Sequence, residues 1–413
     1  MLDSVGNQFN PASARPMRAD KANFISYLER FNRIGKATET FTENGIRYYV
    51  NDYWTSAQRQ ANRLHEISYR ACFKAELPAF FISALTAAGD IVYDPFMGRG
   101  TTPLQAALMG RKPIGNDINP LSEMLLRPRF TPPKLAEVAT RLDEIDWQRD
   151  TPIDKSLLVF YHPATLKQII ALKHWLAERN HRKNGLDNID DWIRMVALNR
   201  LTGHSSGFFS VYTLPPNQAV SVERQAKINA HRKQTPPKRY VKSIILKKTK
   251  VLISQSEGFY CPDALLGKSP ADKTAFIDSG CVDLVVTSPP FLDIVQYHKD
   301  NWLRCWFASI AADAVPISMH KSIAAWTEFV RKTLSELARV MKAGGHLAFE
   351  VGEVRKGKIL LEKYVIQAAQ NLPFDILGVM VNQQNFTKTA NCWGINNNHK
   401  GTNSNRIILM KRY

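Results

Sequence analysis

Apolar and polar positions along the chain follow two patterns, and the order of these patterns predicts the fold. Short, mostly apolar runs, typical of strands buried on both faces, occur at Ile91-Val92-Tyr93 and Val282–Val286. Apolar positions at helical spacing occur at residues 76–90 and 326–341, and glycines end both patterns. Strands that alternate with helices predict an α/β fold with a mainly parallel sheet.

The alternation continues beyond these four segments. A helix at 103–109 leads to a strand at 113–115, and further strands are expected at 346–351, 376–381 and 406–410. We therefore predict a doubly wound, Rossmann-like sheet. Its two halves are residues 51–124 and 259–413, and residues 1–50 form an N-terminal arm.

Residues 125–258 interrupt the alternation and form a large insert, helical and basic in character. Helical patterns occur at 164–180 and 189–201, before a segment rich in glycine, serine and aromatic residues. A basic run follows, from Arg224 to Lys250, with ten lysine and arginine residues and no acidic residue. Within it we predict a loop at 234–237 and short strands at 241–246 and 251–253.

Much of the net positive charge of the chain lies in the basic run. The chain has 413 residues with 55 basic and 37 acidic side chains, a net charge of +18, and over half of this charge lies in the run. Such clustering predicts a polyanionic partner, with nucleic acid favoured over an acidic membrane surface. The alternative is a solvated basic face that binds nothing.

The rest of the composition excludes several classes of protein. No run of 18 apolar residues is present, which argues against a transmembrane helix. The first residues lack a secretion signal, so we expect a cytoplasmic protein. The five cysteines are odd in number and far apart, so we expect neither a metal site nor a disulfide framework.

The first candidate site is a glycine-rich loop between a strand and a helix, Asp94-Pro95-Phe96-Met97-Gly98-Arg99-Gly100-Thr101-Thr102. Glycines there let the backbone approach a ligand closely, and the helix N-terminus offers unpaired N–H groups. Asp117 ends the next strand, where a carboxylate can accept both hydroxyls of a ribose. A P-loop is excluded, because its lysine motif is absent.

The second candidate site is Ser288-Pro289-Pro290-Phe291, directly after a buried-type strand. Two prolines cannot continue a strand ladder, so the chain turns at the carboxyl end of the strand, where α/β sheets bind ligands. The Ser288 hydroxyl and the Pro289 carbonyl can accept both hydrogens of an amino group. The Phe291 ring can stack on a planar base.

Together these residues resemble the S-adenosylmethionine-dependent DNA amino-methyltransferases of the N4-cytosine/N6-adenine group, over about 63–130 and 259–413. The resemblance implies a Rossmann-like methyltransferase sheet. It implies Ser288, Pro289, Pro290 and Phe291 as the catalytic motif. It also implies a cofactor site made of Asp94, Pro95, Phe96, Gly98, Gly100, Thr101, Thr102, Asp117, Ile118 and Asp263. The Asp263 motif fits an ordinary surface turn as well as it fits a cofactor contact. The pairs Phe73-Lys74 and Leu77-Pro78 resemble the element that closes over the methionine of the cofactor.

Two features depart from the family pattern. Arg99 stands where a small residue is more usual, and a local salt bridge would explain it. The insert lies between the Asp117 strand and the Asp263 segment, whereas family members place the recognition region elsewhere. We interpret the insert as the target-recognition region, and expect it to bind DNA through Arg232, Lys233, Lys238 and Arg239, from its position and charge.

The expected reaction is methyl transfer from S-adenosylmethionine to the exocyclic N4 of cytosine in double-stranded DNA. The base would be flipped out of the duplex and stacked on Phe291. A serine that begins the motif favours cytosine N4 over adenine N6. Adenine N6, an RNA substrate and a non-catalytic nucleic-acid-binding protein stay open as alternatives. The resemblance suggests a bacterial or phage-encoded enzyme that acts on the nucleoid, either beside a companion restriction endonuclease or as an orphan.

Overall fold

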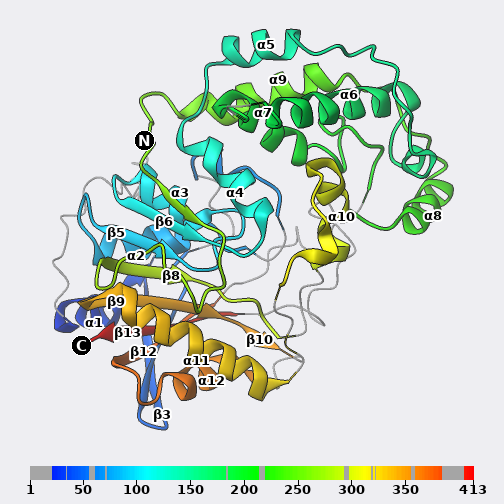
Figure 1. Cartoon of the computed structure of the whole chain (residues 1–413). Helices are drawn as coiled ribbons and strands as arrows, with labels where there is room; N and C mark the ends of the chain where they lie inside the picture. Colours follow the sequence, from blue (N-terminus) through cyan, green and yellow to red (C-terminus); the bar gives the residue numbers. More distant parts are fainter. Residues whose placement is uncertain are drawn as a thin grey trace, which may run out of the picture.

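The centre of the molecule is a nine-stranded sheet (Figure 1). The computed structural model describes residues 21–33, 35–54, 61–69, 72–182, 185–213, 219–292, 297–317, 320, 322–354, 359–383 and 404–413. The strands of the sheet are β3 (Glu39–Glu43), β4 (Ile46–Asn51), β5 (Ile91–Asp94), β6 (Lys112–Asn116), β7 (Leu265–Gly267), β8 (Val282–Thr287), β9 (Met341–Val351), β12 (Phe374–Gln383) and β13 (Ser404–Arg412). Two short hairpins lie outside it: β1 (Asn32–Arg33) with β2 (Lys36–Ala37), and β10 (Glu353–Val354) with β11 (Ile359–Leu360).

The strand order is β3-β4-β12-β13-β9-β8-β5-β6-β7. Only β3 and β13 pair with their neighbours in antiparallel fashion, so the other strands of this sheet all run in one direction. Their carboxyl ends therefore lie along one edge. From β5 the chain extends the sheet through β6 and β7, and from β8 it extends the sheet the other way through β9. The neighbouring strands β5 and β8 are thus the topological switch point, where α/β sheets bind ligands.

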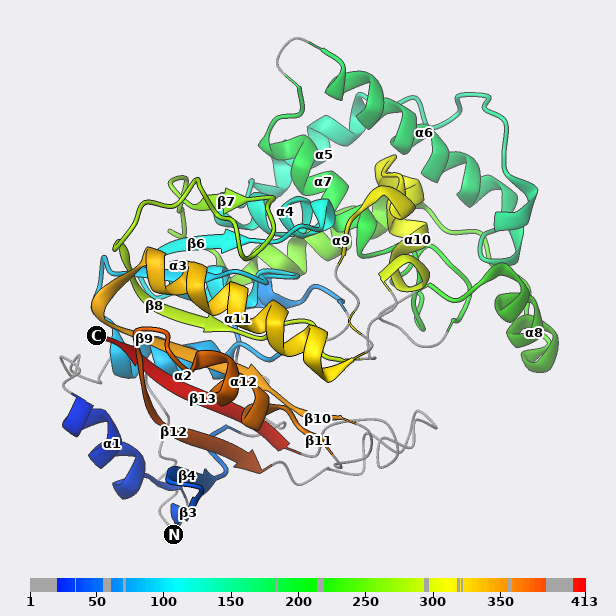
Figure 2. The same ribbon diagram turned by 60° about the horizontal axis from the view of Figure 1, so that its bottom comes forward.

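Helices cover both faces of the sheet. The helices are α1 (Lys21–Arg30), α2 (Glu76–Leu85), α3 (Thr101–Leu108), α4 (Pro120–Leu126), α5 (Leu135–Asp143), α6 (Pro163–Asn180), α7 (Asn188–Leu198), α8 (Val222–Arg232), α9 (Val241–Leu252), α10 (Tyr297–Ala308), α11 (Ile323–Val340) and α12 (Leu361–Ala369). Strand β8 shows how the faces are filled. Val285 packs in the core beneath α11 and α12, whereas Leu284 and Val286 pack in the core beneath α1 and α2. In Figure 2, α11 and α12 lie in front of the sheet.

The predicted α/β class and the doubly wound sheet are confirmed. The apolar run predicted at Val282–Val286 is β8, and the helix predicted at 326–341 is α11. Because β8 is central, its side chains are buried on both faces, which explains why its sequence is almost continuously apolar.

The structure differs from the expectation in two places. Residues 39–50, expected in the N-terminal arm, lie in the hairpin of β3 and β4, and β4 pairs in parallel with β12. Residues 241–246 and 251–253, predicted as short strands, lie in α9 and the 3-10 turn that follows it. The strand prediction was wrong because Val241, Ile244, Ile245 and Leu252 are buried on one face at helical spacing, which outweighs their β propensity.

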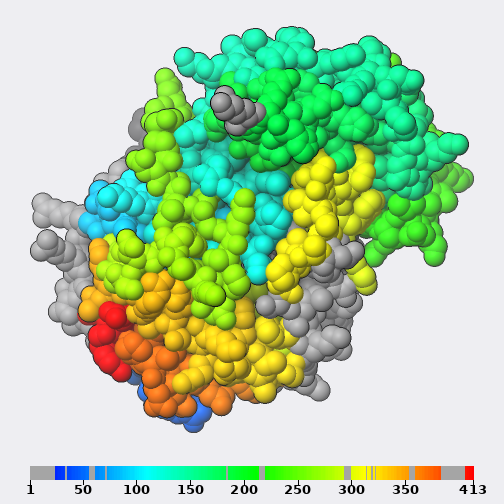
Figure 3. All heavy atoms as spheres, viewed as in Figure 1, coloured from blue at the N-terminus to red at the C-terminus, as the bar shows by residue number. Residues whose placement is uncertain are grey.

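The insert shares its hydrophobic core with the sheet domain. One cluster of buried side chains joins α4, the insert helices and α10, with members such as Leu125, Trp192, Ile245 and Leu303. Figure 3 shows the insert, in teal and green, as a lobe beside the sheet domain, in contact with α10, in yellow. No helix within the described ranges is long and apolar enough to cross a membrane.

Candidate active site at the carboxyl edge of the sheet

The glycine-rich loop lies after β5, at the switch point. Gly98 and Gly100 have φ values of +51° and +80°, which most L-residues avoid. A Cβ added to Gly100 would lie 2.5 Å from Leu126 Cδ1, so a side chain has no room there. The loop is thus a tight backbone turn that ends at the N-terminus of α3 (Thr101–Leu108), the end of a helix that favours negatively charged ligand groups.

Asp94 and Thr102 connect this loop to strand β8. The Thr287 hydroxyl donates to Asp94 Oδ1 at 2.6 Å, and the Thr102 hydroxyl donates to the Val286 carbonyl at 3.0 Å. Burial raises the pKa of the Asp94 carboxyl to about 7, although the hydrogen bond from Thr287 opposes this shift. Both predicted motifs therefore lie against each other at the ends of β5 and β8.

Asp117 follows β6 and faces the glycine-rich loop. Its Oδ2 accepts from the Gly98 backbone N–H at 2.8 Å, and its Oδ1 accepts from the Asn119 N–H at 2.9 Å. Burial raises the pKa of the Asp117 carboxyl, and these two hydrogen bonds oppose the shift. Each carboxylate oxygen can accept a further hydrogen bond, so Asp117 can bind a hydroxyl pair beside the half-buried Ile118.

Asp263 is not brought to this site. It is exposed, two residues before the amino end of β7, whereas Asp117 follows the carboxyl end of the neighbouring β6. The β7 residue beside Asp117 is Gly267, whose carbonyl accepts from the Asp117 N–H at 3.3 Å. The structure thus differs from the expectation for Asp263, because the parallel register puts this carboxylate at the opposite end of the strand pair.

Arg99 has a different role from the expected salt bridge. Its guanidinium donates to the carbonyls of Ile67 at 2.9 Å and Phe73 at 3.2 Å, and to the Thr101 hydroxyl at 3.1 Å. These bonds attach Ile67 and Phe73 to the glycine-rich loop. Phe73 belongs to the element expected to close over the cofactor, so Arg99 holds one end of that element beside the loop.

Ser288 lies directly after β8 and is half-buried, as are Pro290 and Phe291, whereas Pro289 is buried. The indole N–H of Trp326, on α11, donates to the Pro290 carbonyl at 2.9 Å and fixes the turn. The Ser288 hydroxyl is hydrogen-bonded to the carboxyl of Glu350, on β9. Asn405 Nδ2, on β13, donates to Glu350 Oε1 at 2.7 Å.

Glu350, Asn405 and Trp326 are not among the residues predicted from the sequence. One signal was present for Glu350, because a carboxylate interrupts the otherwise apolar run Leu347–Val351. No local signal pointed to Asn405 or Trp326, since their role depends on which strands and helices become neighbours.

The four predicted DNA-binding residues lie at the end of α8 and in the segment that leads to α9. Arg232, Lys233 and Lys238 are exposed, and Arg239 is half-buried. The Arg232 guanidinium lies 3.8 Å from the centre of the Tyr212 ring. In both ribbon views α8 lies on the side toward which the strands of the sheet point (Figures 1 and 2).

Two lysines of the basic run form ion pairs with carboxylates of the same chain. Lys242 forms an ion pair with Asp143, and Lys248 forms one with Glu66 at 3.0 Å. The other eight have no ion-pair partner among the carboxylates of the described ranges. Most of the positive charge of the run is therefore not compensated within the structure.

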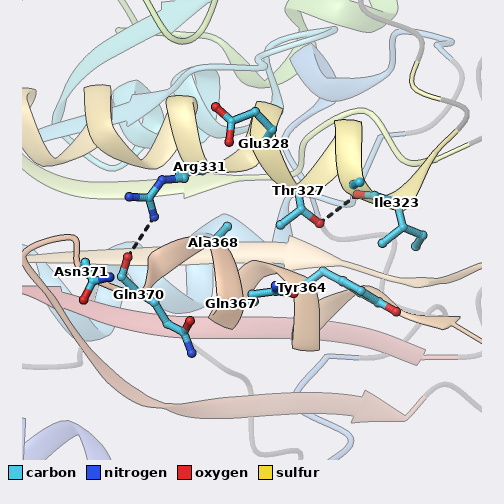
Figure 4. A pocket seen from close by; sticks show the side chains of 10 residues that line it. Ile323, Thr327, Glu328, Arg331, Tyr364, Gln367, Ala368, Gln370 and Asn371 are labelled. Carbon is cyan, nitrogen blue, oxygen red and sulfur yellow. Dashed lines mark hydrogen bonds between the residues drawn. The ribbon is translucent and has the colours of Figure 1, made fainter.

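A pocket also lies between α11 and α12, lined by Thr327, Arg331 and Gln370 among others (Figure 4). Arg331 donates to the Gln370 carbonyl at 2.9 Å and connects the two helices across it. None of the predicted site residues lines this pocket.

The doubly wound sheet, the glycine loop after β5 and the acid after β6 define an α/β protein built to bind a nucleoside-type cofactor at its switch point. Residues 19–123 match the model of a family described as DNA methylase. The type II methyltransferase M.BsoBI of Geobacillus stearothermophilus is 31% identical over 125 residues, which are 30% of this chain and 21% of that protein. The type II methyltransferase M.MvaI of Kocuria varians is 24% identical over 310 residues, 68% of this chain and 64% of that protein.

These matches confirm the resemblance to the S-adenosylmethionine-dependent DNA amino-methyltransferases of the N4/N6 group. The chain spans between about a fifth and two thirds of the length of these two relatives. Among solved structures, TrmN from Thermus thermophilus is similar with a TM-score of 0.34 and 9% identity, over 85% of this chain and 52% of that chain. The fold assignment rests on the strand order, not on that similarity.

Proposed function

We propose that this protein is a DNA methyltransferase that uses S-adenosylmethionine and modifies the exocyclic N4 of cytosine in double-stranded DNA. The observation that carries the proposal is the contact between its two motifs: the Thr287–Asp94 hydrogen bond holds the catalytic turn beside the glycine-rich loop. A methyl donor on the loop and an amine at the turn would then be neighbours.

The cofactor fits the residues after β5 and β6. A side chain would be strained by the left-handed backbone at Gly98 and Gly100, and at Gly100 it would also collide with Leu126, so the backbone itself forms the cradle. Asp117 would accept the ribose hydroxyls, and Ile118 would contact the adenine. When bound, S-adenosylmethionine supplies a methyl group on a sulfonium, an electrophile that needs no metal or covalent enzyme intermediate.

The catalytic turn has the groups that an exocyclic amine needs. The lone pair of this amine is delocalised into the ring, so the amine is a poor nucleophile. The Ser288 hydroxyl and the Pro289 carbonyl would accept its two hydrogens, favour a pyramidal nitrogen and localise the lone pair. Phe291 would stack on the flipped base. Catalysis would therefore consist mainly of positioning and electrostatics.

The basic surface of the insert supports a duplex substrate. Arg232, Lys233, Lys238 and Arg239 are proposed to contact phosphates, because no carboxylate of the described ranges pairs with them. Phosphate contacts position a protein on DNA without specifying sequence. The proposal therefore assigns these four residues to affinity and assigns sequence recognition to other residues of the insert.

The decisive experiment incubates the purified protein with duplex DNA and S-adenosylmethionine labelled in the methyl group. We expect label in the DNA, and N4-methylcytosine as the labelled nucleoside after nuclease digestion and mass spectrometry. Ser288→Ala should lower the transfer rate at least 100-fold, a loss of about 2.7 kcal/mol of transition-state stabilisation. It should leave cofactor binding, measured by calorimetry, unchanged.

The outcomes separate the alternatives. If the labelled nucleoside is N6-methyladenine, the target base is adenine and not cytosine, and the protein is still a DNA methyltransferase. Label in RNA alone would correct the substrate. Absence of transfer to any duplex, or full activity of the Ser288→Ala variant, would refute the proposed function. Methylation-aware sequencing of DNA from a methylation-free host that expresses the protein would then give the target sequence.

A further inference from the structure

A carboxyl group lies inside the sheet, next to the catalytic serine. Glu350 is only 6% exposed, near the carboxyl end of β9. The neighbouring strand β8 pairs with β9 in parallel, and Thr287 lies opposite Phe349. The residues that follow this pair are Ser288, directly after β8, and Glu350, on β9, so the sheet register brings these two residues together.

The two side chains also share a face of the sheet. Along β9, Leu347 and Phe349 pack in the core beneath α11 and α12, whereas Ala348 packs in the core beneath α1 and α2. Strand side chains alternate, so Glu350 points to the same face as Ala348, and Ser288 points to the same face as Val286. The hydrogen bond between the Ser288 hydroxyl and the Glu350 carboxyl follows from this geometry.

Asn405 completes the group from the other side of β9. Strand β13 pairs with β9 so that Ile407 lies opposite Glu350, and Asn405 is two residues away on the same face. Its amide Nδ2 donates to Glu350 Oε1 at 2.7 Å. The next residue, Arg406, points to the opposite face, where it donates to Glu362 on α12 at 2.7 Å. Among the described residues, Ser288 and Asn405 are therefore the polar groups that bond to Glu350.

A buried carboxyl with two neutral partners is costly. Burial raises its pKa to about 7, and the hydrogen bonds from Ser288 and Asn405 oppose the shift. A glutamine of the same shape would make similar hydrogen bonds without this cost. The acid is consequently unexplained by packing, and it touches the one hydroxyl to which the proposed function assigns a role.

We propose that Glu350 is a positioning residue that orients the Ser288 hydroxyl and takes its proton, so that Ser288, Glu350 and Asn405 form a proton relay for the methyl transfer. The inference rests on the proposed function. When Glu350 is ionised, the Ser288 hydroxyl donates to it. Both lone pairs of the serine oxygen are then available to accept an N–H of the substrate amine.

The relay accounts for the proton that the amine loses in the reaction. The amine nitrogen forms a bond to the methyl carbon with its lone pair, while the carbon–sulfur bond breaks and its electron pair stays on sulfur. The nitrogen becomes cationic and still carries its hydrogens. One of them passes to the Ser288 oxygen as the Ser288 hydroxyl proton passes to Glu350. The products are a neutral methylated amine and a protonated Glu350, which returns its proton to water.

The test has one part that needs no catalysis. Infrared titration of the carboxyl groups of the full chain should show a carboxylic acid that ionises near pH 7 and is absent from Glu350→Gln. In Ser288→Ala and Asn405→Ala this ionisation should move to higher pH, because each loses a hydrogen bond that favours the carboxylate. Glu362→Gln, at another buried carboxyl on the opposite face, is the matched control and should keep the signal.

The second part measures single-turnover methyl transfer between pH 5 and 9. The wild-type rate should fall on the acid side as Glu350 becomes protonated. Glu350→Gln should lower the rate at least 10-fold at pH 8, and its rate should no longer fall at acid pH. It should bind S-adenosylmethionine and DNA normally. In Asn405→Ala the decrease of the rate at acid pH should remain but occur at higher pH. In Glu362→Gln it should occur at the same pH as in the wild type.

The outcomes distinguish this inference from the proposed function. If no carboxyl titrates near neutrality, or if Ser288→Ala leaves its titration unchanged, the relay is refuted whatever the activity. If the wild type transfers methyl groups and Glu350→Gln has the same rate and pH profile, the relay is refuted and the proposed function stands. If the wild type transfers none, the proposed function fails, and with it the relay.

Discussion

At the scale of single residues, Glu350 shows that ionising a buried carboxyl at the candidate site costs free energy of folding. A carboxyl whose pKa is raised by burial binds its proton more tightly in the folded than in the unfolded chain. Its ionisation therefore opposes folding. Asp94, at the neighbouring strand end, has a pKa raised to about 7 for the same reason. Two buried acids at one sheet edge indicate that this edge is shaped for ligands and not for stability.

The first prediction concerns the pH dependence of stability. Below the unfolded pKa of Glu350, both states are protonated and the residue costs nothing. As pH rises toward 7, only the unfolded state ionises, so stability falls, by about 3 kcal/mol in total, and then stays constant. Urea unfolding from pH 4.5 to 8 should show this fall in the difference between wild type and Glu350→Gln. The Asp94 contribution cancels, and a pH-independent difference would contradict the assignment.

Strands and loops, at the scale of elements, are attached to one another by buried amides. Asn382, at the end of β12, is fully buried. Its Oδ1 accepts from the backbone N–H groups of Tyr53 at 2.8 Å and Trp54 at 3.3 Å. Its Nδ2 donates to the Trp54 carbonyl at 3.3 Å. A single side chain thus fixes the segment after β4 to the carboxyl edge of the sheet.

The second prediction is that Asn382→Ala destabilises the protein by about 2–4 kcal/mol, because it leaves buried backbone groups of Tyr53 and Trp54 without partners. Guanidinium unfolding would measure the loss. Asn180, exposed at the end of α6, provides the control, and Asn180→Ala should change stability by less than about 0.5 kcal/mol. Equal effects of both substitutions would show that the contacts of Asn382 contribute nothing.

The whole molecule is electrically asymmetric, because eight uncompensated charges of the basic run lie on the insert. Charge of this kind releases counterions from DNA in proportion to the number of phosphates contacted. The insert also shares a hydrophobic core with α4 and α10, and Leu126 of α4 packs against Gly100 of the glycine-rich loop.

The third prediction concerns this charge. Replacing Arg232, Lys233, Lys238 and Arg239 with glutamine should weaken duplex binding. It should also reduce the slope of log affinity against log salt by up to about 3.6, or roughly 0.9 per lost contact. Cofactor affinity should not change. A control with Arg331, Lys332, Lys342 and Lys363 replaced removes the same charge from other elements of the chain. If both variants lose affinity equally, the effect is one of net charge and the insert is not the docking surface.

Sequence patterns predicted those parts of the molecule whose cause is local. The turn at Gly98 and Gly100 and the strand end at Ser288 are specified by glycines and prolines within a few residues. The pairing of β9 with β13 joins residues far apart in the sequence, so no local pattern could place Asn405 beside Glu350. The edge strand β3 was missed because its residues are nearly all exposed and lack an apolar pattern.

Strand β13 has a consequence for how the protein is made. It lies between β12 and β9 in the middle of the sheet, although it comes last in the described part of the chain. Until its residues leave the ribosome, β9 has an open edge and Glu350 lacks Asn405. The edge that holds Ser288 can therefore be completed only after residues 404–412 have been synthesised. Under the proposed function, a nascent chain would present the basic insert before it has the completed edge that methyl transfer would need.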